Sequence, residues 1–167
     1  MSENQRTGGA RALLFERLVD VEPERKEEPF RVLSRKELRR SVSRELGRLL
    51  NTRCPVPLRR LGEEARTVIN YGLPDFTSLS PQNAGDCQLI AGIIAETVTA
   101  YEPRLRNVRV RVEHFEDEER TLHIAIDGDL VTDTVVEVHS HSEHSSAGEP
   151  ISFPVVLHSR TGILEVD

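Results

Sequence analysis

The side chains best suited to chemistry form one short run of histidines and acids in the C-terminal part of the chain. In an extended segment His139 and His141 would point the same way, so Glu143 or His144 could help them hold a divalent metal ion. Serine and glycine surround this run, which is the composition of a solvated loop. We therefore interpret the run as a loop and expect neither a metal nor another cofactor.

Carboxylates are the second group of residues with catalytic potential. Glycoside hydrolysis needs two carboxyl groups facing each other across a cleft, one of them with a raised pKa. Most acids here lie in solvated runs such as 116–119, and aromatic residues that could stack on sugars make up only 4% of the chain, with no Trp. The sequence also lacks a glycine-rich phosphate loop, a GxSxG elbow and a HExxH helix. We expect no enzyme activity, and a cell-wall glycoside hydrolase is the enzymatic alternative.

The cysteines and the apolar runs indicate the compartment. Cys54 and Cys87 stand apart without a CxxC spacing, which favours reduced thiols. No apolar run approaches the roughly 18 residues of a membrane-spanning helix, and the first ten residues lack the apolar core of a signal peptide. We expect a cytoplasmic protein.

Charge is unevenly distributed along the 167 residues. The net charge is −6, but residues 1–70 carry 16 Lys and Arg against 11 Asp and Glu, whereas residues 71–167 carry 6 against 17. Nucleic acid bound at the basic half would bring phosphates near the acidic half, and no aromatic platform accompanies the arginines. The asymmetry instead favours protein partners of differing charge.

The chain is predicted to consist of an N-terminal arm and one domain. Residues 1–32 read as a flexible arm, with a short apolar cluster at 13–19 and a charged, proline-containing linker at 22–29. The cluster either packs onto its own domain or becomes ordered on a partner. Residues 33–167 are long enough for a single domain with a hydrophobic core.

Two long helices are predicted in the first part of this domain. Ser34 and Glu37 form a capping-box pattern at the start of the first helix, and Pro55 prevents its continuation. The apolar face of this helix has helical spacing and consists of Leu38, Val42, Leu46 and Leu49. A basic row beside it recurs every fourth residue and consists of Lys36, Arg40, Arg44 and Arg48. The basic row is either a solvated face or the contact for an acidic partner. A second helix is predicted from about Asn83 to Ala100, before Pro103.

The apolar period then changes from helical to two. Alternating residues predict strands at 108–112, 122–126, 151–157 and 163–166. Pro154 lies within the third run, which favours an edge strand or a bulge because proline cannot donate to a ladder. The expected fold is α+β, with two main helices followed by a small antiparallel or mixed β-sheet.

Three motifs in these elements carry a family resemblance. They are Leu49-Leu50-Asn51-Thr52-Arg53, Tyr71-Gly72-Leu73-Pro74-Asp75-Phe76 and Tyr101-Glu102-Pro103-Arg104-Leu105. Their order and spacing resemble the baseplate subunit TssE of type VI secretion systems, which is similar to the wedge protein of contractile phage tails. The resemblance covers roughly residues 31–167, and the stretch 131–149 matches it least.

The resemblance implies a structural baseplate subunit that binds the core bundle of the larger wedge subunits. It also implies a platform from which the contractile sheath assembles, at the cytoplasmic side of the inner membrane. Glu102, Pro103 and Arg104 correspond to the triplet tied to wedge contact, and Tyr71, Gly72, Leu73, Pro74, Asp75 and Phe76 complete the expected protein-binding set. Opposite charges beside a proline could bind a partner directionally, or could pair with each other or with local backbone.

Two further expectations complete the interpretation. A regulatory adaptor of the same fold is the non-enzymatic alternative to a baseplate subunit. If the strand at 151–157 lies at a sheet edge, its unpaired backbone could accept an extended arm of a sheath subunit.

Overall fold

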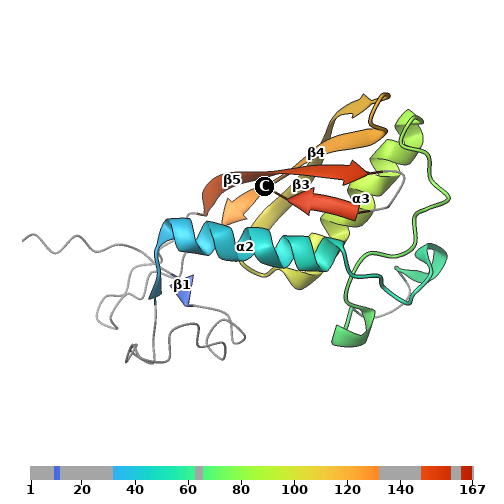
Figure 1. The fold of residues 1–167 in the computed structure, drawn as a ribbon. Coiled ribbons are helices and arrows are strands. Elements are labelled where there is room, and N and C mark those ends of the chain that lie inside the picture. Colours follow the sequence, from blue (N-terminus) through green and yellow to red (C-terminus); the bar gives the residue numbers. More distant parts are fainter. Residues whose placement is uncertain (1–9, 12–31, 63–65, 132–147, 159–162, 167) are drawn as a thin grey trace, which may run out of the picture.

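The computed structural model describes residues 10–11, 32–62, 66–131, 148–158 and 163–166. Two long helices precede a four-stranded sheet (Figure 1). The main elements are α2 (Arg35–Leu50), α3 (Ala84–Tyr101), β3 (Leu105–Glu116), β4 (Thr121–Leu130), β5 (Glu149–His158) and β6 (Ile163–Val166). The short elements are the 3-10 turns η1 (Leu58–Arg60) and η2 (Val68–Asn70), and an antiparallel pair of β1 (Ala10–Arg11) with β2 (Val32–Leu33). This order confirms the predicted α+β class.

Both helices begin where capping residues predict. The backbone N–H of Ser34 donates to the Glu37 carboxylate at 2.8 Å, and the N–H of Glu37 donates back to the Ser34 hydroxyl at 3.4 Å, which completes the capping box of α2. The side chain of Asn83 caps α3 by accepting hydrogen bonds from the N–H groups of Gly85 and Asp86.

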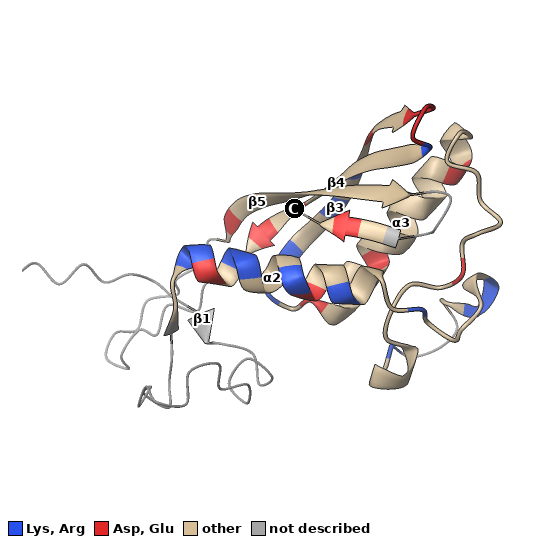
Figure 2. Cartoon of the chain, viewed as in Figure 1, with Lys and Arg blue, Asp and Glu red and all other residues tan. Residues whose placement is uncertain are grey.

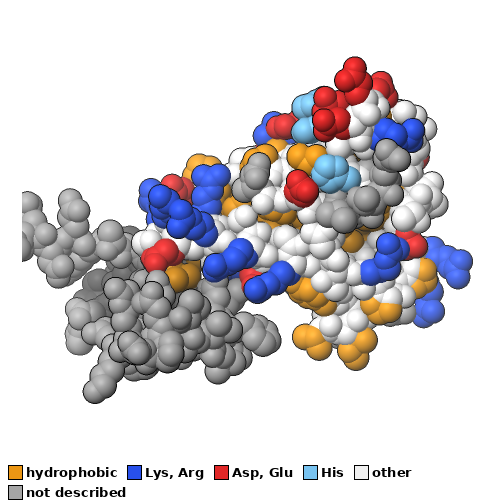
Figure 3. All heavy atoms as spheres, viewed as in Figure 1, with side chains coloured by type: hydrophobic (Ala, Val, Ile, Leu, Met, Phe, Trp, Pro, Cys, Tyr) orange, Lys and Arg blue, Asp and Glu red, His pale blue; other side chains and the backbone are white. Residues whose placement is uncertain are grey.

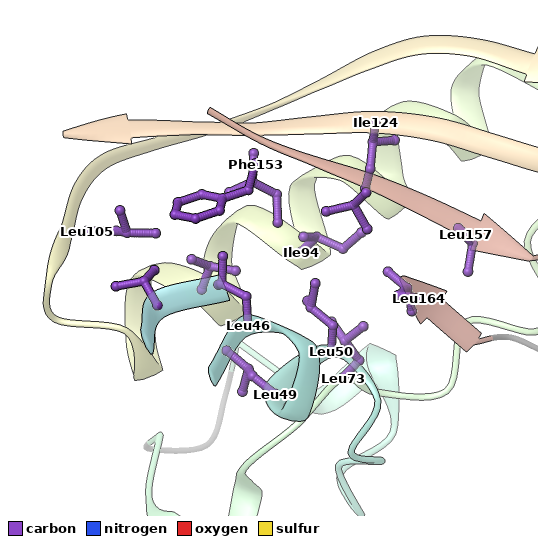
Figure 4. Close-up of a cluster of buried hydrophobic side chains, with 14 of the residues drawn as sticks. Leu46, Leu49, Leu50, Leu73, Ile94, Leu105, Ile124, Phe153, Leu157 and Leu164 are labelled. Carbon is purple, nitrogen blue, oxygen red and sulfur yellow. The ribbon is translucent and has the colours of Figure 1, made fainter. Parts of the chain in front are cut away.

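The sheet is antiparallel throughout, with strand order β3-β4-β5-β6. Alternate residues of β4 point to one face and are fully buried there, and both helices pack on that side, α3 against β3 and α2 against β6. Figure 4 shows the core between α2 and the sheet, formed by residues that include Leu46, Leu49, Leu50, Leu73, Ile94, Ile124, Phe153, Leu157 and Leu164. The fold therefore has two layers, with helices on one face of the sheet.

The prediction of an edge strand at 151–157 is wrong for half of that strand. β5 pairs with β4 along its whole length and also pairs with β6 from Val155 to His158. Pro154 lies one residue beyond the last residue that β6 pairs, so the missing N–H of the proline costs the described sheet no hydrogen bond. The prediction from Pro154 therefore holds for the first half of β5, which pairs with β4 alone, and fails for the second half, which also pairs with β6.

Asn51 joins the end of α2 to the last strand. Its side-chain amide donates to the carbonyl of Leu164 at 2.7 Å and accepts from the N–H of Leu164 at 3.0 Å. The amide group thus pairs with the outer edge of β6 much as a neighbouring strand would. The first helix and the C-terminal strand are in this way fixed to each other through polar as well as apolar contacts.

Charges are unevenly distributed over the described structure. Lys and Arg follow α2, and acids gather at the turn between β3 and β4 (Figure 2). The apolar cluster at 13–19, the linker at 22–29 and the histidine run at 139–144 lie outside the described residues. Within the described part of the chain, no helix is long and apolar enough to cross a membrane.

Candidate protein-binding surface at the helix-to-strand junction

The junction between α3 and β3 contains an internal ion pair. Arg104 donates from Nε and Nη2 to the two carboxylate oxygens of Glu102, at 2.7 and 2.6 Å, and from Nη1 to the hydroxyl of Ser41 at 2.7 Å. The side chains of Glu102 and Arg104 are only 5% and 10% exposed. Of the two alternatives that the sequence leaves open for these charges, the described structure shows the second, in which they pair with each other inside the fold.

Pro103 is the exposed member of the triplet. It lies directly after the helix end, where Glu102 takes the C-cap position of α3. Because the flanking charges are held internally, a partner approaching the junction would contact the proline ring and its neighbours rather than the ion pair. Whether the triplet binds another protein stays a prediction.

The second motif packs against the end of α2. The N–H of Leu73 donates to the carbonyl of Thr52 at 2.8 Å, and the N–H of Cys54 donates to the carbonyl of Leu73 at 2.7 Å. Gly72 has φ = +110°, and a Cβ at this position would lie 2.3 Å from the Thr52 carbonyl oxygen. Only glycine fits this close approach. Two of the motifs that carried the resemblance are therefore in direct backbone contact.

The remaining residues of the second motif differ in exposure. Leu73 and Pro74 are buried, so their contribution is to packing. Phe76 is half-buried against the core. Asp75 is exposed and forms an ion pair with Arg53 at 3.0 Å. Hydrogen bonds from the N–H and hydroxyl of Thr77 hold the pKa of Asp75 below its ordinary value.

Tyr71 connects the second motif with the third. Its ring meets the ring of Tyr101 edge-to-face, with 5.3 Å between centroids. Burial raises the pKa of the Tyr71 hydroxyl above its ordinary value, and the carboxylates of Glu45 and Glu102 raise it further while Arg48 lowers it. The hydroxyl is therefore neutral at physiological pH and available as a hydrogen-bond donor.

The three motifs meet around one small pocket. Its volume is about 70 Å³, and it is lined by Glu45, Leu49, Tyr71, Tyr101, Glu102 and Pro103. Small-molecule sites usually enclose about 300 Å³ or more, so this pocket is the size of a single protein side-chain group rather than of a sugar chain.

Sequence reasoning missed several residues of this region. Ser41 and Glu45 lie on α2 between its apolar face and its basic row, and only the folded structure brings them to the junction. Val68 and Ile69 were also missed, although they are the most exposed of the large apolar residues that the structure describes. An apolar pair inside a loop-rich stretch was the available signal for them.

Metal binding finds no support in the described ranges. No group of three or more His, Cys, Asp or Glu in them could hold a metal ion, and Cys54 and Cys87 are both buried free thiols. On the outer face of the sheet, the rings of His114 and His123 stack at 4.2 Å, which is a packing contact rather than a ligand arrangement. The candidate metal ligands of the 139–144 run lie in an undescribed segment.

Comparison with known proteins identifies the family. One solved chain, from "The baseplate complex from the type VI secretion system", is similar to this one at 18% identity and a TM-score of 0.45, over 72% of this chain and 94% of that chain. No curated protein matches the sequence. A family model described as "Baseplate wedge protein gp25" matches residues 36–135, which is more than half of the chain and includes all three motifs. The chain therefore belongs to the gp25 baseplate wedge family.

Proposed function

We propose that this protein is a structural, non-catalytic wedge subunit in the baseplate of a contractile type VI secretion apparatus. The observation that carries the proposal is the family match across residues 36–135, because that family is one of baseplate wedge proteins. The three motifs that resemble TssE support assignment to type VI secretion. The assembled protein would lie at the cytoplasmic side of the inner membrane.

The proposed wedge contact lies where the motifs converge. Exposed Pro103, the pocket beside it and the half-buried Tyr71 form a surface on one side of the molecule. Such a surface suits binding to the core bundle of the larger wedge subunits. Glu102 and Arg104 would act there as positioning residues, since their ion pair fixes the backbone on both sides of the proline.

The proposed sheath contact lies at the sheet. Sheath subunits would add an extended arm to an open strand edge, where main-chain hydrogen bonds supply affinity and alternate side chains set the register. The helices at the junction and the sheet edge would then serve two different partners, which is what a platform between wedge and sheath requires.

Affinity capture tests the wedge part of this proposal. The full chain carries a tag at its chromosomal locus, and captured proteins are identified by mass spectrometry. We expect the larger baseplate subunits in stoichiometric amounts, and loss of fluorescent sheath extension when the gene is deleted. Normal sheath extension in the deletion strain would refute the structural role. Release of soluble fragments from peptidoglycan by the purified protein, abolished by one carboxylate substitution, would instead support the hydrolase alternative.

A further inference from the structure

The turn η2 presents two large aliphatic side chains to solvent. Val68 is 89% exposed and Ile69 is 77% exposed, whereas the other exposed large apolar residues of the described structure, Leu89 and Val112, reach 47% and 38%. Single exposed apolar residues are common. Two adjacent and almost fully exposed ones have an unfavourable hydration free energy, which burial against a binding partner would remove. The pair is therefore a candidate anchor.

Hydrogen bonds hold this turn in place. The hydroxyl of Tyr101 donates to the carbonyl of Thr67 at 2.9 Å, and the N–H of Asn70 donates to the same carbonyl at 3.0 Å. The Tyr101 ring is itself fixed against Tyr71. A turn that is fixed before binding loses little conformational entropy when a partner contacts it. Val68 and Ile69 are thus presented by a rigid support.

The anchor adjoins the pocket and, through it, the basic side of α2. Tyr71 and Tyr101 belong to both the support of η2 and the pocket wall, and α2 contributes Glu45 and Leu49 to that wall. From there the exposed residues Lys36, Arg40, Arg44 and Arg48 run along α2 over about 18 Å. Figure 3 shows both features on one face, with basic side chains along α2 and apolar side chains below them where Figure 1 draws η2.

We propose that Val68, Ile69 and the pocket form the apolar end, and the basic row of α2 the charged end, of one docking surface for a partner protein. The partner would present an apolar surface flanked by carboxylates. Nucleic acid would suit the basic row but offers nothing to two aliphatic side chains, so the composite surface favours a protein. The inference rests on the proposed function, which makes the partner another subunit of the baseplate.

Site-specific photo-crosslinking identifies the occupant. A photoreactive amino acid replaces Ile69 in the full chain expressed in its own host, and cross-linked peptides are sequenced. We expect a peptide from a larger baseplate subunit that contains apolar residues close to Asp or Glu. A cross-link to a sheath subunit, to the 13–19 cluster of this chain, or to a second copy would overturn the inference, and so would the absence of any cross-link in cells with assembled baseplates.

Matched variants measure the contribution of each end. The double variant V68S/I69S should weaken capture of the baseplate subunits at least about tenfold, while Leu89→Ser, which also removes an exposed aliphatic side chain, should not. K36E/R40E should weaken capture too, and its effect should shrink as salt rises. Undiminished capture by folded V68S/I69S would overturn the inference. Failure of the wild-type chain to capture baseplate subunits would instead refute the proposed function.

Discussion

Glu102 and Arg104 form a two-point ion pair with each other although only Pro103 separates them in the chain. Arg104 also donates its backbone N–H to the Glu102 carboxylate at 3.1 Å, so the pair closes a tight loop around the proline. A third contact ties the guanidinium to Ser41 of α2. The pair therefore joins the end of α3, the start of β3 and the middle of α2.

Removing one partner of this pair should destabilise the fold. In Arg104→Ala, the Glu102 carboxylate, whose side chain is only 5% exposed in the intact protein, would lose its counter-charge, which costs roughly 3 kcal/mol in comparable cases. Urea unfolding of the purified variant measures this loss. Arg106→Ala, at an exposed position two residues further along β3, should change the free energy of unfolding by less than about 0.5 kcal/mol. Equal stability of the two variants would contradict an internal role for Arg104.

Gly72 should not tolerate a side chain. Alanine there would combine a positive φ with a Cβ 2.3 Å from the Thr52 carbonyl oxygen, so the contact between the first two motifs must open. We expect a loss of about 2 kcal/mol or more in the free energy of unfolding. Gly92→Ala is the matched control, because a Cβ on Gly92 in α3 meets nothing within 4 Å and alanine favours a helix by up to about 1 kcal/mol. Thermal unfolding should therefore shift in opposite directions for the two variants.

Local chemistry made much of the fold predictable from sequence. The capping box at Ser34 and the side chain of Asn83 set the helix starts through contacts within three residues. Period-two alternation located all four strands of the sheet, because alternate residues of β4 and β5 are buried and those of β3 at Val108 and Val110 are partly buried. These signals depend only on neighbours along the chain, which is why no knowledge of the fold was needed.

Long-range contacts decide what sequence could not predict. The sequence could not decide whether Glu102 and Arg104 bind a partner or each other, because the contact of Arg104 with Ser41 depends on the packing of α2. The sequence also could not show that β6 pairs with the second half of β5. Val68 and Ile69 have the pattern of ordinary loop residues. The hydrogen bond by which Tyr101 holds their turn comes from 34 residues away and cannot be predicted from neighbouring residues. The binding roles of the triplet and of residues 71–76 stay predictions.

The pair of Asp127 with Arg111 should make a small pH-dependent contribution to stability. Hydrogen bonding from Arg111 holds the pKa of Asp127 below its ordinary value of 3.8, so the contribution is present above that pH and is lost as pH falls through the lower folded-state pKa. Asp127→Asn should lower the free energy of unfolding at pH 7 by no more than about 1 kcal/mol, since Arg111 is largely exposed. Denaturant titrations of both proteins should converge only as pH falls through the lowered folded-state pKa of Asp127. A gap that persists at acidic pH would show that the charge of Asp127 is not its cause.

The open edges of the sheet differ in how many backbone groups they can offer to another strand. On the outer side of β6, Asn51 already occupies the N–H and carbonyl of Leu164. The first half of β5, which pairs with β4 but not with β6, contains Pro150 and Pro154, which lack N–H groups. β3 lies at the other edge, pairs only with β4 among the described strands, and contains no proline in its 12 residues.

The pairing register shows which groups of β3 face outward. Since Pro154 cannot donate, its pairing with Ala125 is of the non-hydrogen-bonded type, and Ala125 directs its backbone groups toward Arg111 on the other side. Alternation then leaves the N–H and carbonyl of Val112 pointing away from the sheet. A sheath arm that adds to this edge would need them.

Val112→Pro should therefore block sheath assembly and spare the wedge. The substitution removes an outward N–H and leaves the β3–β4 ladder intact, so the purified variant should keep its circular dichroism spectrum and the tagged variant should still capture the larger baseplate subunits. Fluorescent sheath should fail to extend in cells that carry it.

Arg111→Pro is the contrasting variant, because its N–H is directed into the sheet and its loss should destabilise the fold itself. Val156→Pro could not test an edge, since Val156 pairs with Glu165 of β6. Normal sheath tubes in folded Val112→Pro would show that the sheath does not add a strand to β3, and loss of wedge capture in the same variant would refute separate surfaces for the two partners.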